Sequence, residues 1–189
     1  MSRDAAIALA QESFDSGRFR AELARRVAMP TESQNPERRA ELLRYLEEEM
    51  TPALEKLGFT TEIVTDDSAP GPFRDRHGRQ GHGDVIRGLD ADWEDGLSPW
   101  AVTDRGDRWY GRGVVDNKGQ HGINLAALEA VLETRGHLGF NAKYLIEMGE
   151  EVGSPGLHAV CDTYRDRLKA DVLIASDGPR LTADRPTIF

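Results

Sequence analysis

A chain of 189 residues with 39% hydrophobic and 30% charged residues can bury a core, and none of its apolar runs approaches the ~20 residues of a membrane-spanning helix. The net charge of -9 argues against nucleic acid as a partner, because binding phosphates requires a positively charged face. The single cysteine, Cys161, excludes an internal disulfide and is typical of a reducing compartment, so we expect a cytoplasmic protein.

The first third of the chain has the residue spacing of helices. Apolar residues recur at helical intervals from Ala5 to Val27, and we expect an interruption near Gly17. The segment Asn35-Pro36-Glu37 has the features of a helix start: a capping side chain, a proline and then an acidic residue. Leucines follow at helical spacing, and we expect Pro52 to kink this helix and Gly58 to end it.

Strands and helices are then expected to alternate. The apolar patterns predict a strand at 59–64, a helix at 122–132, a strand at 143–148, a helix at 154–168 with Ser154 as its cap, and a buried strand at 171–175. This alternation is typical of a mostly parallel sheet covered by helices, so we predict an α/β fold.

One segment departs from this pattern. Residues 69–81, APGPFRDRHGRQG, are polar, basic and rich in turn residues, whereas an α/β sheet requires an apolar strand just before His82. We therefore expect a central strand to be missing here. Its loss would leave the neighbouring strands with uncovered edges and would misplace the His82 side chain.

Acidic residues occur where an open α/β sheet binds ligands, beyond the carboxyl ends of its strands. Glu150-Glu151 follows the strand expected to end at Met148, and Asp177 follows the strand expected to end at Ala175. Asp116 lies in a glycine-containing loop just before a helix. Carboxylates crowded at one edge of a sheet repel one another, so a bound cation is the simplest compensation.

The segment His82-Gly83-Asp84 adds an imidazole to these carboxylates. Its spacing allows Asp84 to accept a hydrogen bond from the His82 ring, which would fix the ring tautomer. Oxygen ligands combined with an imidazole suit Zn, Co or Mn better than Ca. Each short motif alone is common in turns and helix starts, and His121, close to the Asp116 loop, fits a structural role better than that of a ligand.

The motifs occur in a family-specific order: GHGDV (81–85), SPW (98–100), DRWYGRGVVDNKG (107–119), EMGEEVGSPGL (147–157) and ASDGP (175–179). Together with MPTES (29–33) and LEKLGF (54–59), they resemble the dinuclear-zinc aminoacylase/carboxypeptidase family. This family includes acetylornithine deacetylase, succinyl-diaminopimelate desuccinylase, aminoacylase, glutamate carboxypeptidase and related dipeptidases. The resemblance covers nearly the whole chain.

The resemblance implies a role for each of six residues. As metal ligands it implies His82, Asp116, Glu151 and Asp177, which would hold two divalent ions, zinc by expectation, with Co or Mn as the alternatives. Asp116 would bridge the two ions, and the family holds the following peptide bond, here to Asn117, in the cis form. Asp84 would orient His82, and Glu150 would be the general base that takes a proton from a metal-activated water.

The implied reaction is hydrolysis of an amide bond in N-acyl amino acids or small peptides. A small molecule or short peptide would be the partner, with no nucleic acid and no membrane. Full-length members of the family also carry a lid or dimerisation domain and a C-terminal catalytic segment, so we expect residues 1–189 to be the N-terminal portion of the catalytic domain. A homodimer is a further expectation for the full-length form, and the alternative to an enzyme is a truncated, non-catalytic remnant with an incomplete metal site.

Overall fold

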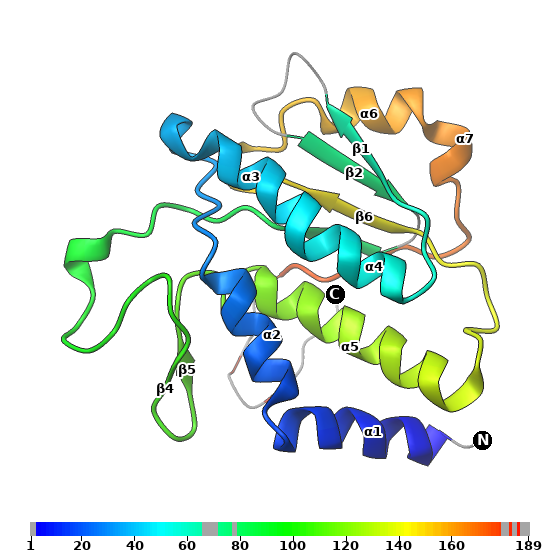
Figure 1. Ribbon diagram of the computed structural model, residues 1–189. Helices are drawn as coiled ribbons and strands as arrows, with labels where there is room; N and C mark the ends of the chain where they lie inside the picture. The colour runs from blue at the N-terminus through cyan, green and yellow to red at the C-terminus, as the bar shows by residue number, and fades with distance from the viewer. Residues whose placement is uncertain (1–2, 66–71, 77–78, 179–181, 183–184, 186–189) are drawn as a thin grey trace.

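A five-stranded sheet forms the centre of the computed structural model, which describes residues 3–65, 72–76, 79–178, 182 and 185 (Figure 1). In spatial order the strands are β1 (Glu62–Thr65), β2 (Pro72–Arg76), β6 (Tyr144–Glu147), β3 (Arg79–His82) and β7 (Ile174–Ala175). β3 pairs in parallel with β6 and β7, whereas β2 runs antiparallel to β1 and β6. All of these strands except β2 therefore run in one direction, which confirms the predicted mostly parallel α/β sheet.

The N-terminal helices follow the predicted order. They are α1 (Arg3–Asp15), α2 (Arg18–Val27), α3 (Arg39–Tyr45) and α4 (Thr51–Lys56). Gly17 separates α1 from α2 at a φ of 78°, a left-handed conformation that favours glycine. Asn35 caps the short 3-10 turn Pro36–Arg38, since its side chain accepts a hydrogen bond from the Glu37 N–H.

The helical stretch that contains Pro52 is irregular just before this proline. A π-helical turn, Leu46–Met50, joins α3 to α4, and Pro52 is the second residue of α4. Gly58 follows the end of α4 at a φ of 83°. The remaining helices are α5 (Lys118–Arg135), α6 (Leu157–Thr163) and α7 (Arg165–Leu168); within the described residues, no helix is both long and apolar enough to cross a bilayer.

Helices cover both faces of the sheet (Figure 1). The main core joins α3, α4 and α5 to β6, through side chains such as Leu46, Leu128 and Ile146. A smaller cluster places Val160 of α6 against Val64 of β1. Because successive residues of a strand point to opposite faces, Ile63 of β1 packs on the main core while Val64 packs on α6.

The expectation of a missing strand before His82 was wrong. The polar segment forms β2 and β3, and β3 lies between β6 and β7, inside the sheet. The ladder of a sheet is built from backbone N–H and C=O groups, so residues of any polarity except proline can supply it. Gly81 and His82, at the end of β3, are buried, and the β3–β6 register sets His82 opposite Glu147.

Two predictions for the last third of the chain were also wrong. The buried strand expected at 171–175 is the two-residue edge strand β7, and it follows side chains that are largely exposed, Val172 at 69% and Leu173 at 67%. Ser154 does not cap a helix, because Gly156 precedes α6, and the Ser154 hydroxyl instead donates to Glu147 Oε1 at 3.0 Å.

A two-stranded ribbon, β4 (Thr103–Asp104) and β5 (Trp109–Tyr110), leads into the loop that carries Asp116. Trp109 stacks on Phe14 and Phe19 of the first two helices, with ring centroids 5.4 and 6.3 Å apart, as expected of a packing residue. After the loop, α5 begins at Lys118, and a side chain at the next residue, Gly119, would collide with the Val114 carbonyl oxygen.

The close approach at Gly119 predicts that Gly119→Ala destabilises the fold. The obstacle is backbone of the Asp116 loop rather than a flexible side chain, so we expect a loss of about 1–3 kcal/mol in the free energy of unfolding, measured in urea. Gly122→Ala is the matched control in the same helix, because its Cβ would meet side chains rather than backbone: Arg26 Nη1 at 3.2 Å and the Phe19 ring at 3.6 Å. Equal losses for the two variants would contradict the prediction.

Candidate functional site

His82 is the centre of the acidic cluster. Its side chain, at the carboxyl end of β3, is only 2% exposed, and its Nε2 lies 2.9 Å from Asp116 Oδ1, 3.7 Å from Asp177 Oδ2 and 3.8 Å from Glu150 Oε2. Ligand atoms of His82, Asp116 and Asp177 lie within 4.8 Å of one another, and the same holds for His82, Glu150 and Glu151. The structure thus brings together five residues from four separate segments of the chain.

Asp84, the sixth predicted residue, is fully buried below this cluster. Its carboxylate accepts hydrogen bonds from the backbone N–H groups of Glu150 and Glu151, each at 3.2 Å. The sequence indicated only its contact with the His82 ring. Asp84 therefore orients the Glu150–Glu151 turn as well, and the N–H groups of that turn supply part of the partners that a buried carboxylate requires.

The tautomer of His82 follows from its contacts. Nδ1 donates to the main-chain oxygen of Asp84 at 3.0 Å and lies 3.3 Å from the Asp84 carboxylate. The sequence predicted a hydrogen bond from the His82 ring to the Asp84 carboxylate. This contact is longer than the one to the Asp84 main-chain oxygen, and both involve Nδ1. Because Nδ1 is used in this way, Nε2 is the nitrogen that faces the other carboxylates, as a metal ligand must.

Burial and nearby charges perturb the ionisation of His82, Asp116, Glu150 and Glu151. Burial alone would lower the pKa of His82, but hydrogen bonds to Asp116 and Asp84 raise it to about 11. The hydrogen bond from His82 lowers the pKa of Asp116. Burial raises the pKa of Glu150 and of Glu151, and the neighbouring carboxylates add to both shifts. Negative charge is therefore crowded at this edge of the sheet.

These residues fit a divalent metal ion. One imidazole nitrogen and the oxygens of four partly exposed carboxylates converge on one small region, and this donor set suits Zn²⁺ and similar cations. Burial raises the pKa values of Glu150 and Glu151 first and the neighbouring carboxylates add to the shift; a cation would relieve this second contribution.

His121 supports His82 from below and has the structural role that we predicted. Its Nδ1 donates to the His82 carbonyl oxygen at 3.1 Å, and its Nε2 accepts a hydrogen bond from the Tyr45 hydroxyl at 2.6 Å. Tyr144 donates to the main-chain oxygen of His121. Burial lowers the pKa of His121 well below its usual value, so this ring is neutral and its Nε2 can accept the hydrogen bond from the Tyr45 hydroxyl.

The MPTES segment lies against the same site. Thr31 Oγ1 donates to the Gly83 carbonyl oxygen at 2.6 Å, and the Val85 N–H donates to the Thr31 carbonyl oxygen. Gln34 Nε2 donates to the Glu151 carbonyl oxygen at 3.2 Å. The sequence alone indicated no role for Thr31 or Gln34, although Thr31 belongs to the MPTES motif and Gln34 follows it directly.

The side chain of Lys118 anchors the loop that carries Asp116. Its Nζ, fully buried, donates to the carbonyl oxygens of Arg26 and Met29 at 2.9 and 2.6 Å, and burial lowers its pKa to about 7. The peptide bond between Asp116 and Asn117 is cis, as the resemblance implied.

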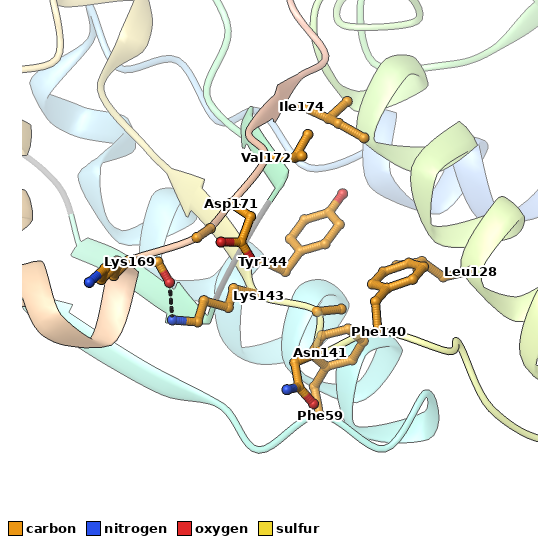
Figure 2. Close-up of a pocket in the computed structure, with 12 residues that line it drawn as sticks. Phe59, Leu128, Phe140, Asn141, Lys143, Tyr144, Lys169, Asp171, Val172 and Ile174 are labelled. Atoms are coloured by element: carbon orange, nitrogen blue, oxygen red, sulfur yellow. Dashed lines mark hydrogen bonds between the residues drawn. The ribbon is translucent and has the colours of Figure 1, made fainter.

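A pocket of about 560 Å³ lies at the other end of the strands, near the amino ends of β6 and β7 (Figure 2). It is lined by apolar side chains such as Phe59, Leu128 and Val172, and Lys143 at its rim donates to the Lys169 carbonyl oxygen at 2.6 Å. Asp171 is the single carboxylate among its described lining residues, so this pocket lacks the ligand set found around His82.

Comparisons with known proteins agree with this geometry. The model of Peptidase family M20/M25/M40 matches residues 79–188. Cysteinylglycine-S-conjugate dipeptidase of Corynebacterium striatum is 35% identical over 91 residues, which are 48% of this chain and 20% of that protein. Beta-Ala-His dipeptidase of Homo sapiens is 33% identical over 112 residues, 57% of this chain and 22% of that protein.

The fold is likewise similar to a solved structure. The crystal structure of human carnosine dipeptidase 1 matches with a TM-score of 0.81 and 25% sequence identity, over 93% of this chain and 41% of that one. The chain thus spans less than half the length of these relatives. The family model covers more than half of the 189 residues and includes all six residues around His82, and the chain therefore belongs to Peptidase family M20/M25/M40.

Proposed function

We propose that this protein is a metal-dependent peptidase that hydrolyses the amide bond of short peptides, and that the chain supplies part of its catalytic domain. The observation that carries the proposal is the convergence of two carboxylate pairs, Asp116 with Asp177 and Glu150 with Glu151, on the imidazole of His82. Short peptides are the substrates that we propose, because two relatives of this chain are named as dipeptidases. N-acyl amino acids contain the same amide bond and form the second substrate class.

In this proposal the site holds two divalent metal ions, with zinc as the first choice and Co or Mn as alternatives. His82 and Asp177 would hold one ion, Glu151 the other, and Asp116 would bridge them. Such ions supply a Lewis acid for the scissile carbonyl and lower the pKa of a water molecule. Asp84 fixes the positions of His82 and of the Glu150–Glu151 turn relative to each other through its hydrogen bonds.

Glu150 is the general base of this proposal. Its carboxylate is part of the cluster and lies 3.8 Å from His82 Nε2, yet it remains 40% exposed, so that water and substrate can reach it. Burial is the main cause of its raised pKa, and this raised pKa makes Glu150 a better proton acceptor than an isolated glutamate. The same carboxyl group can then return the proton to the leaving amine.

The remaining expectations stay predictions. A short peptide is the partner that we propose; a homodimer of the full-length form and a cytoplasmic location rest on the family resemblance and on the single cysteine.

The proposed roles predict different outcomes for two substitutions. His82→Ala removes a ligand and should lower the metal content of the purified chain, measured by elemental analysis. Glu150→Gln should leave the metal content unchanged and reduce chelator-sensitive hydrolysis of a dipeptide panel by about 100-fold or more. A wild-type chain that retains no metal would contradict the proposal and favour the non-catalytic remnant.

The raised pKa of His82 predicts that metal binding releases a proton. In the metal-free chain this pKa is about 11, so at neutral pH a metal ion must displace the proton from the imidazole. The apparent affinity for Zn²⁺ should therefore rise about tenfold per pH unit between about pH 6 and about pH 8. Titration calorimetry in two buffers of different ionisation enthalpy measures the proton released, about one for each His82 site filled.

The same proton stabilises the metal-free fold. Its contribution to the free energy of unfolding is complete below the unfolded pKa of 6.5 and is lost as the pH rises through about 11.

His158→Gln is the control for the pH dependence of metal affinity, because His158 is a highly exposed histidine on α6 and lies outside the cluster. It should leave the pH dependence of metal affinity unchanged, and a wild-type affinity that does not vary with pH would contradict the prediction.

A further inference from the structure

Asp177 lies beyond the most weakly held strand of the sheet. β7 has two residues and pairs with β3 at the edge, and within the described part of the chain no strand lies on its other side. The side chains of Val172, Leu173 and Ile174 are largely exposed. Packing therefore does little to fix the position of this segment, although Asp177 Oδ2 lies 3.7 Å from His82 Nε2.

Two buried amides hold the segment in its place. Asn117 Nδ2 donates to the Ser176 carbonyl oxygen at 2.7 Å, and Asn124 Nδ2 donates to the Ser176 hydroxyl at 2.5 Å. Asn117 directly precedes α5 and has no exposed surface, and Asn124, nearly two turns into α5, is 9% exposed. We call these three residues the Ser176 clamp.

The clamp connects two of the three acidic segments of the site, those of Asp116 and Asp177. Asn117 follows Asp116 directly in the chain, and Ser176 directly precedes Asp177. The hydrogen bond from Asn117 to Ser176 therefore ties the backbones that carry two of the three members of the His82, Asp116 and Asp177 group.

We propose that Asn117 is a positioning residue, which sets the spacing between Asp116 and Asp177 through the Ser176 clamp. This inference rests on the proposed function, because the spacing between the Asp116 and Asp177 carboxylates affects function when both bind a common cation. The chemistry requires an amide: Nδ2 carries two hydrogens and donates one to Ser176 and the other to Gln120 Oε1, at 2.8 Å. An aspartate or an apolar residue at 117 donates neither.

Metal affinity is the first test. Asn117→Leu keeps a similar volume and removes both donors, and we expect about 10–100-fold weaker Zn²⁺ binding in competition with a chromophoric chelator. Gln120→Ala is the matched control, because it removes the other partner of Asn117 and leaves the bond to Ser176 intact. Its Zn²⁺ affinity should stay within about twofold of wild type.

Hydrogen exchange of the metal-free chain is the second test, and it does not depend on metal binding. Peptides covering residues 174–178 should exchange faster in Asn117→Leu than in wild type or Gln120→Ala, because the clamp is then open. Ser176→Ala, at a half-buried position, removes the acceptor of Asn124 without touching the core. It should also raise exchange in this segment, which keeps the proposal testable if Asn117→Leu does not fold.

The two tests separate the inference from the proposed function. Unchanged Zn²⁺ affinity together with unchanged exchange at 174–178 would overturn the inference and leave the proposed function intact. Faster exchange in the variants of a chain that binds no Zn²⁺ would instead overturn the proposed function, while supporting the clamp as the device that positions Asp177. Unchanged exchange in a folded Ser176→Ala variant would count against the clamp even if Asn117→Leu failed to fold.

Discussion

The parallel pairing of β3 with β6 is the constraint on which the site depends. Its register sets His82 beside Glu147, so that both strands end at the same edge of the sheet. The Gly83 N–H extends the ladder by one bond to the Glu147 carbonyl oxygen. Glu150 follows Glu147 by three residues and lies near His82. The Asp84 carboxylate accepts hydrogen bonds from the backbone N–H groups of Glu150 and Glu151 and so holds this turn. A slip of this register would separate the imidazole from two carboxylates at once.

Below this edge, two sets of buried polar groups are paired with one another. The Tyr45 hydroxyl, the His121 ring and the His82 carbonyl oxygen form one chain of hydrogen bonds, and the Lys118 ammonium is held by two carbonyl oxygens. Unpaired groups of this kind would each cost about 1–3 kcal/mol, so the network fixes one arrangement of the backbone rather than several. The rigidity of the layer under His82 contrasts with the exposed carboxylates above it, such as Asp116 with 59% of its side chain exposed.

The sequence predicted those elements and site residues whose signals lie in neighbouring residues of the chain. The capping residues around Asn35, the break at Gly17 and the alternation of helices with strands predicted the elements, and the order of acidic residues after strands predicted the cluster. The segment before His82 was misjudged because polarity was taken as evidence against a strand, whereas pairing with β6 and β7 depends on backbone groups. The contacts that support the site could not be predicted, because partners such as Tyr45 and His121, or Asn117 and Ser176, lie 76 and 59 residues apart in the chain.

The short edge strand β7 has a consequence for how the chain behaves in concentrated solution. Its backbone has partners in β3, and within the described residues its outer edge is open and is flanked by exposed Val172 and Leu173. An open strand edge with apolar neighbours is a template for intermolecular pairing and hence for aggregation. Within the described residues, the segment that delivers Asp177 to the site thus also offers an edge at which a second chain could pair.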